Sequence, residues 1–265
     1  MNNIRMVGVI MKTICIFNQK GGVGKTTTNI NLCSYLAMQG KKILTIDIDP
    51  QGNTTSGLGF DKKKINLSIY DLLTSDISIR DTIKECELIN NLYLVPSTME
   101  LAGAEVELIN RSNRENILKE KLIEIEGEFD YIFIDCPPSL GILTINALTA
   151  ADSVLTPIQC EFYALEGVGQ LVNTIQLVKK SLNKKLEIEG IILSMYDNRT
   201  KLCNEVVSEV RKYFNEKVYN TTIPRNVRLA EAPSFGLPIM LYDDKCKGAE
   251  AYEALANEFS DRQRR

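Results

Sequence analysis

Lys20-Gly21-Gly22-Val23-Gly24-Lys25-Thr26-Thr27 is the stretch of this 265-residue chain that decides its fold. It fits the phosphate-loop pattern G-x-x-x-x-G-K-[ST] only at its end, because Gln19 stands where that pattern has its first glycine. An apolar, β-branched run at residues 13–17 precedes the stretch, and a helical run at residues 26–38 follows it. A strand, a glycine-rich loop and a helix in this order predict a phosphate-binding loop.

The residues of this loop have expected roles in holding a nucleotide. Backbone N–H groups point at phosphate oxygens in such a site; here they belong to Gly21, Gly22, Val23, Gly24, Lys25, Thr26 and Thr27. The Lys25 ammonium adds positive charge at the β- and γ-phosphates, and the Thr26 hydroxyl is placed for Mg²⁺. A plain glycine turn needs only one or two residues with positive φ and does not need Gly-Lys-Thr at a helix start. Lys20 is surplus to this arrangement and needs a reason of its own.

The rest of the chain alternates strands with helices. Strands are predicted at residues 13–17, 42–47, 92–96, 131–135, 153–157, 190–195 and, with a weaker pattern, 218–223. Helices are predicted at residues 26–39, 69–73, 112–125, 164–180, 204–214 and 248–259. The central strands are continuous apolar runs, which is typical of a parallel sheet covered by helices on both faces. We expect one doubly wound, mostly parallel α/β sheet of the phosphate-loop NTPase type over residues 11–265, with residues 1–10 as a disordered extension.

Acidic residues stand at the ends of two further strands. Asp47 and Asp49 follow one apolar run, and Asp135 ends another. Because the carboxyl ends of parallel strands share one edge of the sheet, these acids are expected beside the phosphate loop rather than as solvated turn residues. Asp135 is therefore predicted to hold Mg²⁺ together with Thr26. Asp49 is the candidate for orienting the attacking water, because it lies in a loop; for Asp47 a structural role and a role near Mg²⁺ both stay open.

Composition narrows the possible functions. The net charge of −3 argues against nucleic-acid binding through overall charge, although a local basic face remains possible. The absence of histidine excludes Ser-His and Cys-His nucleophiles and histidine metal sites. Seven scattered cysteines without a Cys-x-x-Cys pair predict reduced thiols in a cytoplasmic protein. No segment approaches the roughly 18 apolar residues of a membrane span, so no membrane partner is expected.

Three motifs together resemble a known family. They are the loop with its extra lysine, which is the deviant Walker A motif, the run Asp47-Ile-Asp-Pro-Gln-Gly-Asn53, and the run Asp135-Cys-Pro-Pro-Ser139. In this combination the chain resembles the ParA/Soj partition ATPases, which belong to a wider group with MinD and the nitrogenase iron protein. The resemblance extends from about Met11 to the C-terminus. Segments similar to the Soj-like chromosomal branch are Leu101-Ala-Gly-Ala-Glu105, Asn146-Ala-Leu-Thr-Ala150, Gln159-Cys-Glu-Phe-Tyr-Ala-Leu-Glu-Gly167 and Ile223-Pro-Arg-Asn-Val-Arg-Leu-Ala-Glu-Ala-Pro233.

The resemblance implies an ATPase that uses ATP and Mg²⁺ as cofactors. It gives Lys20 a role, because the signature lysine of this family crosses the interface of an ATP-sandwich homodimer and contacts the partner's phosphates. Hydrolysis is assigned to the residue that matches Asp49, so Lys20, Lys25 and Asp49 are the expected catalytic residues. Adenine recognition is assigned in part to the loop that contains Pro224 and Arg225.

The resemblance also implies DNA binding. Arg199 and Arg228 match the phosphate-contacting arginines of the family, and both lie late in the chain, apart from the phosphate-site segments. Spacing alone fits a solvated surface equally well, and the resemblance favours DNA. The expected partners are double-stranded DNA bound without sequence preference, and a ParB-type centromere-binding protein that stimulates hydrolysis. The expected location is the cytoplasm, at the nucleoid.

Two other functions within the wider group are ranked lower. A membrane-cycling ATPase like MinD needs a C-terminal amphipathic helix, whereas residues 257–265 have no apolar stripe beyond Phe259. An electron-transfer protein like the nitrogenase iron protein needs a second suitably placed cysteine motif besides Cys136, and none is visible in the sequence.

Overall fold

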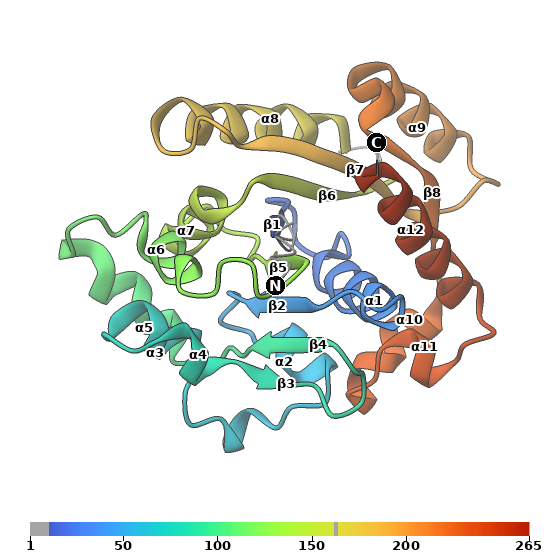
Figure 1. Ribbon diagram of the computed structural model, residues 1–265. Coiled ribbons are helices and arrows are strands. Elements are labelled where there is room, and N and C mark those ends of the chain that lie inside the picture. Colours follow the sequence, from blue (N-terminus) through green and yellow to red (C-terminus); the bar gives the residue numbers. More distant parts are fainter. Residues whose placement is uncertain (1–10, 162–163, 265) are drawn as a thin grey trace, which may run out of the picture.

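The computed structural model describes residues 11–161 and 164–264, and these residues form one eight-stranded sheet (Figure 1). The strand order is β3-β4-β2-β5-β1-β6-β7-β8. All neighbouring strands are parallel except β3 and β4, which pair antiparallel at one edge. The strands are β1 Lys12–Ile16, β2 Ile43–Asp47, β3 Lys84–Glu85, β4 Leu92–Val95, β5 Tyr131–Asp135, β6 Ser153–Gln159, β7 Glu187–Tyr196 and β8 Val218–Pro224. The predicted mostly parallel, doubly wound sheet is confirmed, while the predicted extension at residues 1–10 lies outside the described residues.

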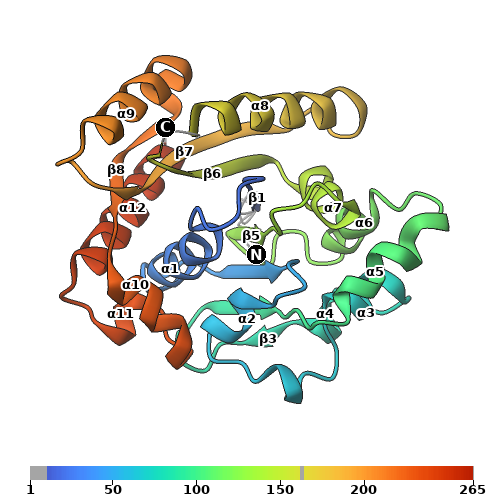
Figure 2. The ribbon, with the colours of Figure 1, turned by 180° about the vertical axis from the view of Figure 1, so that it is seen from behind.

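Helices cover both faces of this sheet (Figure 1 and Figure 2). They are α1 Lys25–Met38, α2 Asn53–Gly57, α3 Ile69–Thr74, α4 Ile79–Thr82, α5 Leu101–Glu107, α6 Ile117–Ile123, α7 Ile142–Ala150, α8 Ala164–Ser181, α9 Lys201–Phe214, α10 Val227–Glu231, α11 Ile239–Tyr242 and α12 Lys247–Gln263. One core lies between the sheet and α3 to α8, and another lies between the sheet and α1, α11 and α12. A third, smaller core joins α9 to β7. None of the described helices is long and apolar enough to cross a membrane.

Alternate residues of the central strands supply the two large cores. In β1, Cys15 packs into the core under α7, whereas Ile14 and Ile16 pack into the core under α1. Because both faces of the strand are buried, every position favours an apolar residue, and the strand has no polar alternation. This double burial explains the continuous apolar runs from which the strands were predicted.

The position of β1 brings the candidate site residues to one place. From β1 the chain crosses to β2, on the β5 side of the sheet, whereas after β5 it continues to β6 on the other side of β1. Ligands of open α/β sheets bind at such a switch point, outside the carboxyl ends of the strands. At this edge Asp135 pairs in register with Ile16 of β1 and with Asp47 of β2.

The predicted elements differ from the observed ones in two informative places. The helix predicted at residues 112–125 begins only at Ile117, because Asn113 adopts a left-handed φ of 57° within a preceding turn. Helix α7 was not predicted as a helix at all. Most of its residues are buried, so it lacks the polar stripe by which an amphipathic helix is recognised.

Candidate nucleotide-binding site

The phosphate loop joins β1 to α1 and leaves the first turn of α1 without a side-chain cap. Gly24 is the N-cap residue, with φ of 92°, and Gly22 has φ of 74°. Both angles lie in the left-handed region that glycine adopts without strain. Across the described residues no side chain caps the start of α1, so its first N–H groups remain available. Free N–H groups and the positive end of the helix dipole make this position suited to an anion.

Lys25 places a positive charge inside the loop. Its side chain is buried, and Nζ donates a hydrogen bond of 3.2 Å to the backbone oxygen of Lys20. Burial lowers the pKa of Lys25, while the charge of Asp135 acts against that shift. An anion at the helix start would therefore meet an ammonium group that is already desolvated and held in place.

Asp135 is buried and has one carboxylate oxygen without a partner among the described groups. Its Oδ2 accepts hydrogen bonds of 2.8 Å from the hydroxyls of Thr26 and Thr54. Its Oδ1 is buried and has no hydrogen-bond partner among the described groups. Burial raises the pKa of Asp135 to about 6, against the effect of the two hydroxyl donors. A buried carboxylate oxygen without a partner is costly unless something binds it, and Mg²⁺ prefers this kind of oxygen ligand. Asp135 and Thr26 thus fit the predicted metal site.

Asp47 and Asp49 differ sharply in environment although they are two residues apart. The Asp47 carboxylate is fully buried, and its Oδ2 accepts from the backbone N and the hydroxyl of Thr55 at 2.8 and 2.7 Å. Burial, and then the charge of Asp135, raises the pKa of Asp47 to about 7. Asp49 is partly exposed, and its Oδ1 accepts from the backbone N of Gln51 at 2.9 Å. The structure therefore supports a structural role for Asp47 and leaves Asp49 at the open edge of the site.

Lys20 forms an ion pair that the sequence did not reveal. Its Nζ lies 3.2 Å from the Glu161 carboxylate, which follows β6, and the Arg225 guanidinium lies 3.8 Å from the other oxygen of the same carboxylate. Glu161 therefore links the phosphate loop to the segment after β8. The side chains of Lys20 and Glu161 are 37% and 46% exposed, so this pair can exchange partners at small cost.

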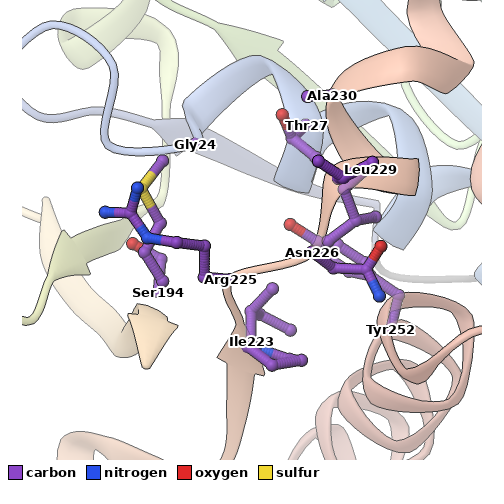
Figure 3. A pocket seen from close by; sticks show the side chains of 12 residues that line it. Gly24, Thr27, Ser194, Ile223, Arg225, Asn226, Leu229, Ala230 and Tyr252 are labelled. Carbon is purple, nitrogen blue, oxygen red and sulfur yellow. The ribbon is translucent and has the colours of Figure 1, made fainter. Parts of the chain in front are cut away.

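An apolar cavity of about 300 Å³ opens beside the loop (Figure 3). Gly24 and Thr27 form its wall on the loop side, and Tyr252 of α12 contributes to another wall. The other lining residues are Ser194, Met195, Ile223, Pro224, Arg225, Asn226, Val227, Leu229 and Ala230. The cavity adjoins the start of α1 and includes both residues predicted for adenine contact. A flat apolar ring could enter it while an attached phosphate chain reached the loop.

Comparisons with known proteins agree with this geometry. A family model described as an AAA domain matches residues 11–188. The sporulation initiation inhibitor protein Soj of Bacillus subtilis is 57% identical over 93% of this chain and 97% of its own. The chromosome partitioning protein ParA of Myxococcus xanthus is 55% identical over 95% of this chain and 88% of its own. The chain belongs to the ParA/Soj family of chromosome-partitioning ATPases.

A solved structure that is similar to this chain holds a nucleotide and magnesium. The structure named cobyrinic acid a,c-diamide synthase, from Mycobacterium smegmatis, superposes with a TM-score of 0.83 at 36% identity and covers 96% of both chains. It holds ADP and magnesium, and the same protein has also been seen with an ATP analogue and magnesium. The predicted family, the ATPase class and the cofactors ATP and Mg²⁺ are thereby confirmed.

The two arginines predicted to bind DNA are exposed, and each is already paired with an acid. Arg199 donates from Nε and Nη2 to the Asp197 carboxylate at 2.8 and 2.7 Å, and these bonds lower the pKa of Asp197 to about 2. Arg228 lies 2.9 Å from Glu231 and 3.4 Å from Asp243. Arg228 is also closer to the nucleotide site than its place in the sequence suggested. Its neighbours Val227 and Leu229 on α10 line the cavity, because the segment after β8 returns to the carboxyl edge of the sheet.

The structure also bears on the two lower-ranked functions. The thiol of Cys136 is buried, with its sulfur 3.1 Å from that of Cys15, so it faces the interior of the sheet rather than a surface cluster. The apolar residues of α12, including Leu255 and Phe259, are buried against the sheet and α1. Among the described residues, Cys136 is thus a buried thiol, and α12 packs its apolar residues on the core.

Sequence reasoning missed several residues of the site because no motif marks them. Thr54, Thr55 and Ser97 bind the strand-end carboxylates or the backbone beside them, and Glu161 binds Lys20. Glu161 could have been found, since it follows a predicted strand at the same edge as the three acids. The threonines could not, because helix α2 has only five residues and no sequence pattern predicted it.

Proposed function

We propose that this protein is a DNA-segregation ATPase that forms an ATP-sandwich dimer, binds nucleoid DNA without sequence preference, and hydrolyses ATP when a ParB-type centromere-binding protein stimulates it. The proposal rests on family membership together with the geometry around the phosphate loop. The observation that carries it is the open space at Gly21, where an added Cβ would meet no atom of the described residues within 4 Å and where φ is not positive.

The free groups of the site support a position for each part of the nucleotide. Its phosphates fit at the N–H groups of residues 21–27, with Lys25 beside the β- and γ-phosphates. Its adenine ring fits the apolar cavity that contains Pro224 and Arg225. Thr26 and the free Oδ1 of Asp135 would hold Mg²⁺, which neutralises charge on the phosphate oxygens.

Gly21 supports the dimer. A Cβ at Gly21 would meet no atom of the described residues within 4 Å, and its φ is not positive. Neither packing nor backbone conformation therefore requires glycine at this exposed position. Close approach of a second molecule would require it, because any side chain here would stand between the two surfaces. Lys20 is next to it, and release from Glu161 would let its ammonium reach the partner's phosphates.

We assign hydrolysis to Asp49 together with the two lysines of the phosphate loop. Asp49 lies in the loop after β2, at the open edge, where its carboxylate could accept a hydrogen bond from a water aimed at the γ-phosphate. Lys20 and Lys25 would offset the negative charge that the two facing nucleotides bring together. Because the site closes only in the dimer, hydrolysis should depend on dimerisation.

DNA binding is proposed for the exposed Arg199 and Arg228. Their ion pairs with acids are exposed and screened by solvent, so a DNA phosphate can replace the acid at low cost. A dimer would present each arginine twice. Affinity and salt sensitivity should therefore increase together when ATP binds, which would make nucleoid attachment depend on the nucleotide.

One experiment tests the proposal as a whole. The protein is analysed by light scattering and by DNA co-sedimentation with no nucleotide, with ADP, and with a non-hydrolysable ATP analogue plus Mg²⁺. We expect a dimer and DNA binding only with the analogue, and no binding to liposomes in any state. A monomer that holds the analogue would contradict the sandwich mechanism, and binding to liposomes but not to DNA would favour the MinD-like function.

A further inference from the structure

The backbone N–H and the backbone carbonyl of Asp49 are both hydrogen-bonded to buried side chains. Its N–H donates to Oδ1 of Asp47 at 3.3 Å, and its carbonyl oxygen accepts from the hydroxyl of Ser97 at 2.7 Å. Asp47 ends β2, and Ser97 follows β4, the neighbouring strand. Both residues are fully buried. The backbone of Asp49 is thus fixed between two strands, although its carboxylate is at the open edge.

Thr55 joins these two supports. Its hydroxyl donates to Oδ2 of Asp47 at 2.7 Å and accepts from the backbone N of Ser97 at 2.9 Å. Its own N–H donates to the same Asp47 oxygen at 2.8 Å. Thr55 is completely buried, and its hydroxyl uses its one donor and accepts one further bond. Asp47, Thr55, Ser97 and the Asp49 peptide form a closed ring of hydrogen bonds.

The residue before Thr55 contacts Asp135, the candidate Mg²⁺ ligand. The hydroxyl of Thr54 donates to Oδ2 of Asp135 at 2.8 Å and accepts from Asn29 of α1 at 3.1 Å. Helix α2 therefore carries, on successive residues, one contact to the candidate Mg²⁺ ligand and one to the ring around Asp49. A shift of α2 would move both.

We propose that Thr55 is a positioning residue, which sets the place of Asp49 through Asp47 and Ser97, and that helix α2 couples this placement to the Asp135 site. The inference rests on the proposed role of Asp49. Buried hydrogen bonds of this kind are stronger than exposed ones and leave few alternative arrangements. A displacement of about 1 Å in a catalytic group can lower the rate of reaction by about a hundredfold.

Substitution at Thr55 provides the first test. Thr55→Val preserves the shape but removes the hydroxyl, whereas Thr55→Ser keeps the hydroxyl. Ser56→Ala on the same helix is the matched control, because its hydroxyl donates only to backbone oxygens of α2 and its N-cap. We expect Thr55→Val to lower kcat about tenfold or more, with the Kd of a non-hydrolysable ATP analogue changed less than about twofold. Thr55→Ser and Ser56→Ala should stay close to wild type in both.

A second variant and a double-mutant cycle distinguish a positioning role of Thr55 from a general loss of folding. Ser97→Ala removes the hydroxyl that binds the Asp49 carbonyl and should lower kcat in the same direction, even if Thr55→Val folds poorly. Thr55→Val is then combined with Asp49→Ala, and single-turnover rates are compared. If Thr55 acts through Asp49, its effect should disappear in the Asp49→Ala background.

Different failures have different meanings. Wild-type kcat in both Thr55→Val and Ser97→Ala, or an undiminished effect of Thr55→Val in the Asp49→Ala background, would overturn the positioning role. Wild-type turnover in Asp49→Ala alone would instead overturn the proposed role of Asp49. The two ideas can therefore be rejected separately.

Discussion

Polar groups are held in opposite ways at the carboxyl edge of the sheet, beside the phosphate loop, and on the surface that carries Arg199 and Arg228. At the edge, Asp47, Thr55 and Asp135 are buried, and their partners come from different strands and helices. On the surface, Arg199 and Arg228 are exposed, and their partners are exposed or half-buried acids: Asp197 for Arg199, and Glu231 and Asp243 for Arg228. The two regions differ in the free-energy cost of losing a hydrogen-bond or ion-pair partner. A buried polar group that loses its partner costs several times as much as an exposed ion pair contributes.

This contrast predicts where substitutions act. Changes at the edge should abolish one defined step of the ATP cycle, because each group there has a single set of partners. Changes on the surface should be graded and salt-dependent, because the exposed charges can be replaced by neighbouring ones.

The largest effect is expected at Asp49. Asp49→Ala should lower ATP turnover by about a hundredfold or more while ATP binding persists, because the water-orienting carboxylate is lost and the phosphate loop is intact. The variant should accumulate as an ATP dimer on DNA. Turnover and analogue affinity are measured together, with Lys25→Ala as the contrast, since that change should weaken nucleotide binding itself. Normal turnover in Asp49→Ala would move the water-orienting role to another residue.

A large effect on assembly is expected at Gly21. Gly21→Val should bind nucleotide almost normally, because a Cβ at this position would meet no atom of the described residues within 4 Å, yet it should fail to dimerise with the ATP analogue. Light scattering with analogue affinity in parallel measures this, and Gly21→Ala should show an intermediate loss. An intact dimer in Gly21→Val would mean that the partner does not approach at this face.

A smaller, graded effect is expected on the arginine surface. Arg228→Glu, and less strongly Arg199→Glu, should weaken ATP-dependent DNA binding without preventing the dimer. Each lost phosphate contact flattens the slope of log affinity against log salt by about 0.9, and a dimer loses two contacts. Because the neighbours of Arg228 line the cavity proposed for adenine, analogue binding must be shown to be normal in the same variant. Wild-type affinity and slope in Arg228→Glu would place the DNA surface elsewhere.

A last prediction concerns stability without Mg²⁺ or nucleotide. The pKa of Asp47 is raised to about 7 in the folded protein from an ordinary value of 3.8. Below that ordinary value both states hold the proton and the contribution to stability is greatest. Between about 3.8 and 7 the unfolded state ionises while the folded state keeps its proton, so the contribution falls as pH rises and is lost once pH passes the folded pKa of about 7. Denaturant unfolding at pH 5 and pH 8 should show this decline, and Asp47→Asn should reduce it; an identical pH dependence in the variant would contradict the assignment.

A feature could be predicted from the sequence when it depends on residues that are close to one another in the chain. Strands with both faces buried were found from their apolar runs, and the phosphate loop from its spacing. Helix α7 was missed because burial on most sides removes the polar stripe. The ion pair of Lys20 with Glu161 was missed because the partners are 141 residues apart and join only when β6 packs against β1.

By itself the sequence determined the family, the ATP-binding loop and the strand-end acids, because these depend on residue types within a few positions of each other. Only the tertiary structure decided that Asp47 is a buried support and Asp49 an open-edge carboxylate. Their separation depends on Thr55 and Ser97, which reach them from α2 and from the end of β4. The tertiary structure also decided that the segment after β8 returns to the phosphate loop, so that Pro224 and Arg225 line the cavity beside Gly24. The physical reason is that burial and hydrogen-bond partners are set by strand order, which no local pattern in the sequence contains.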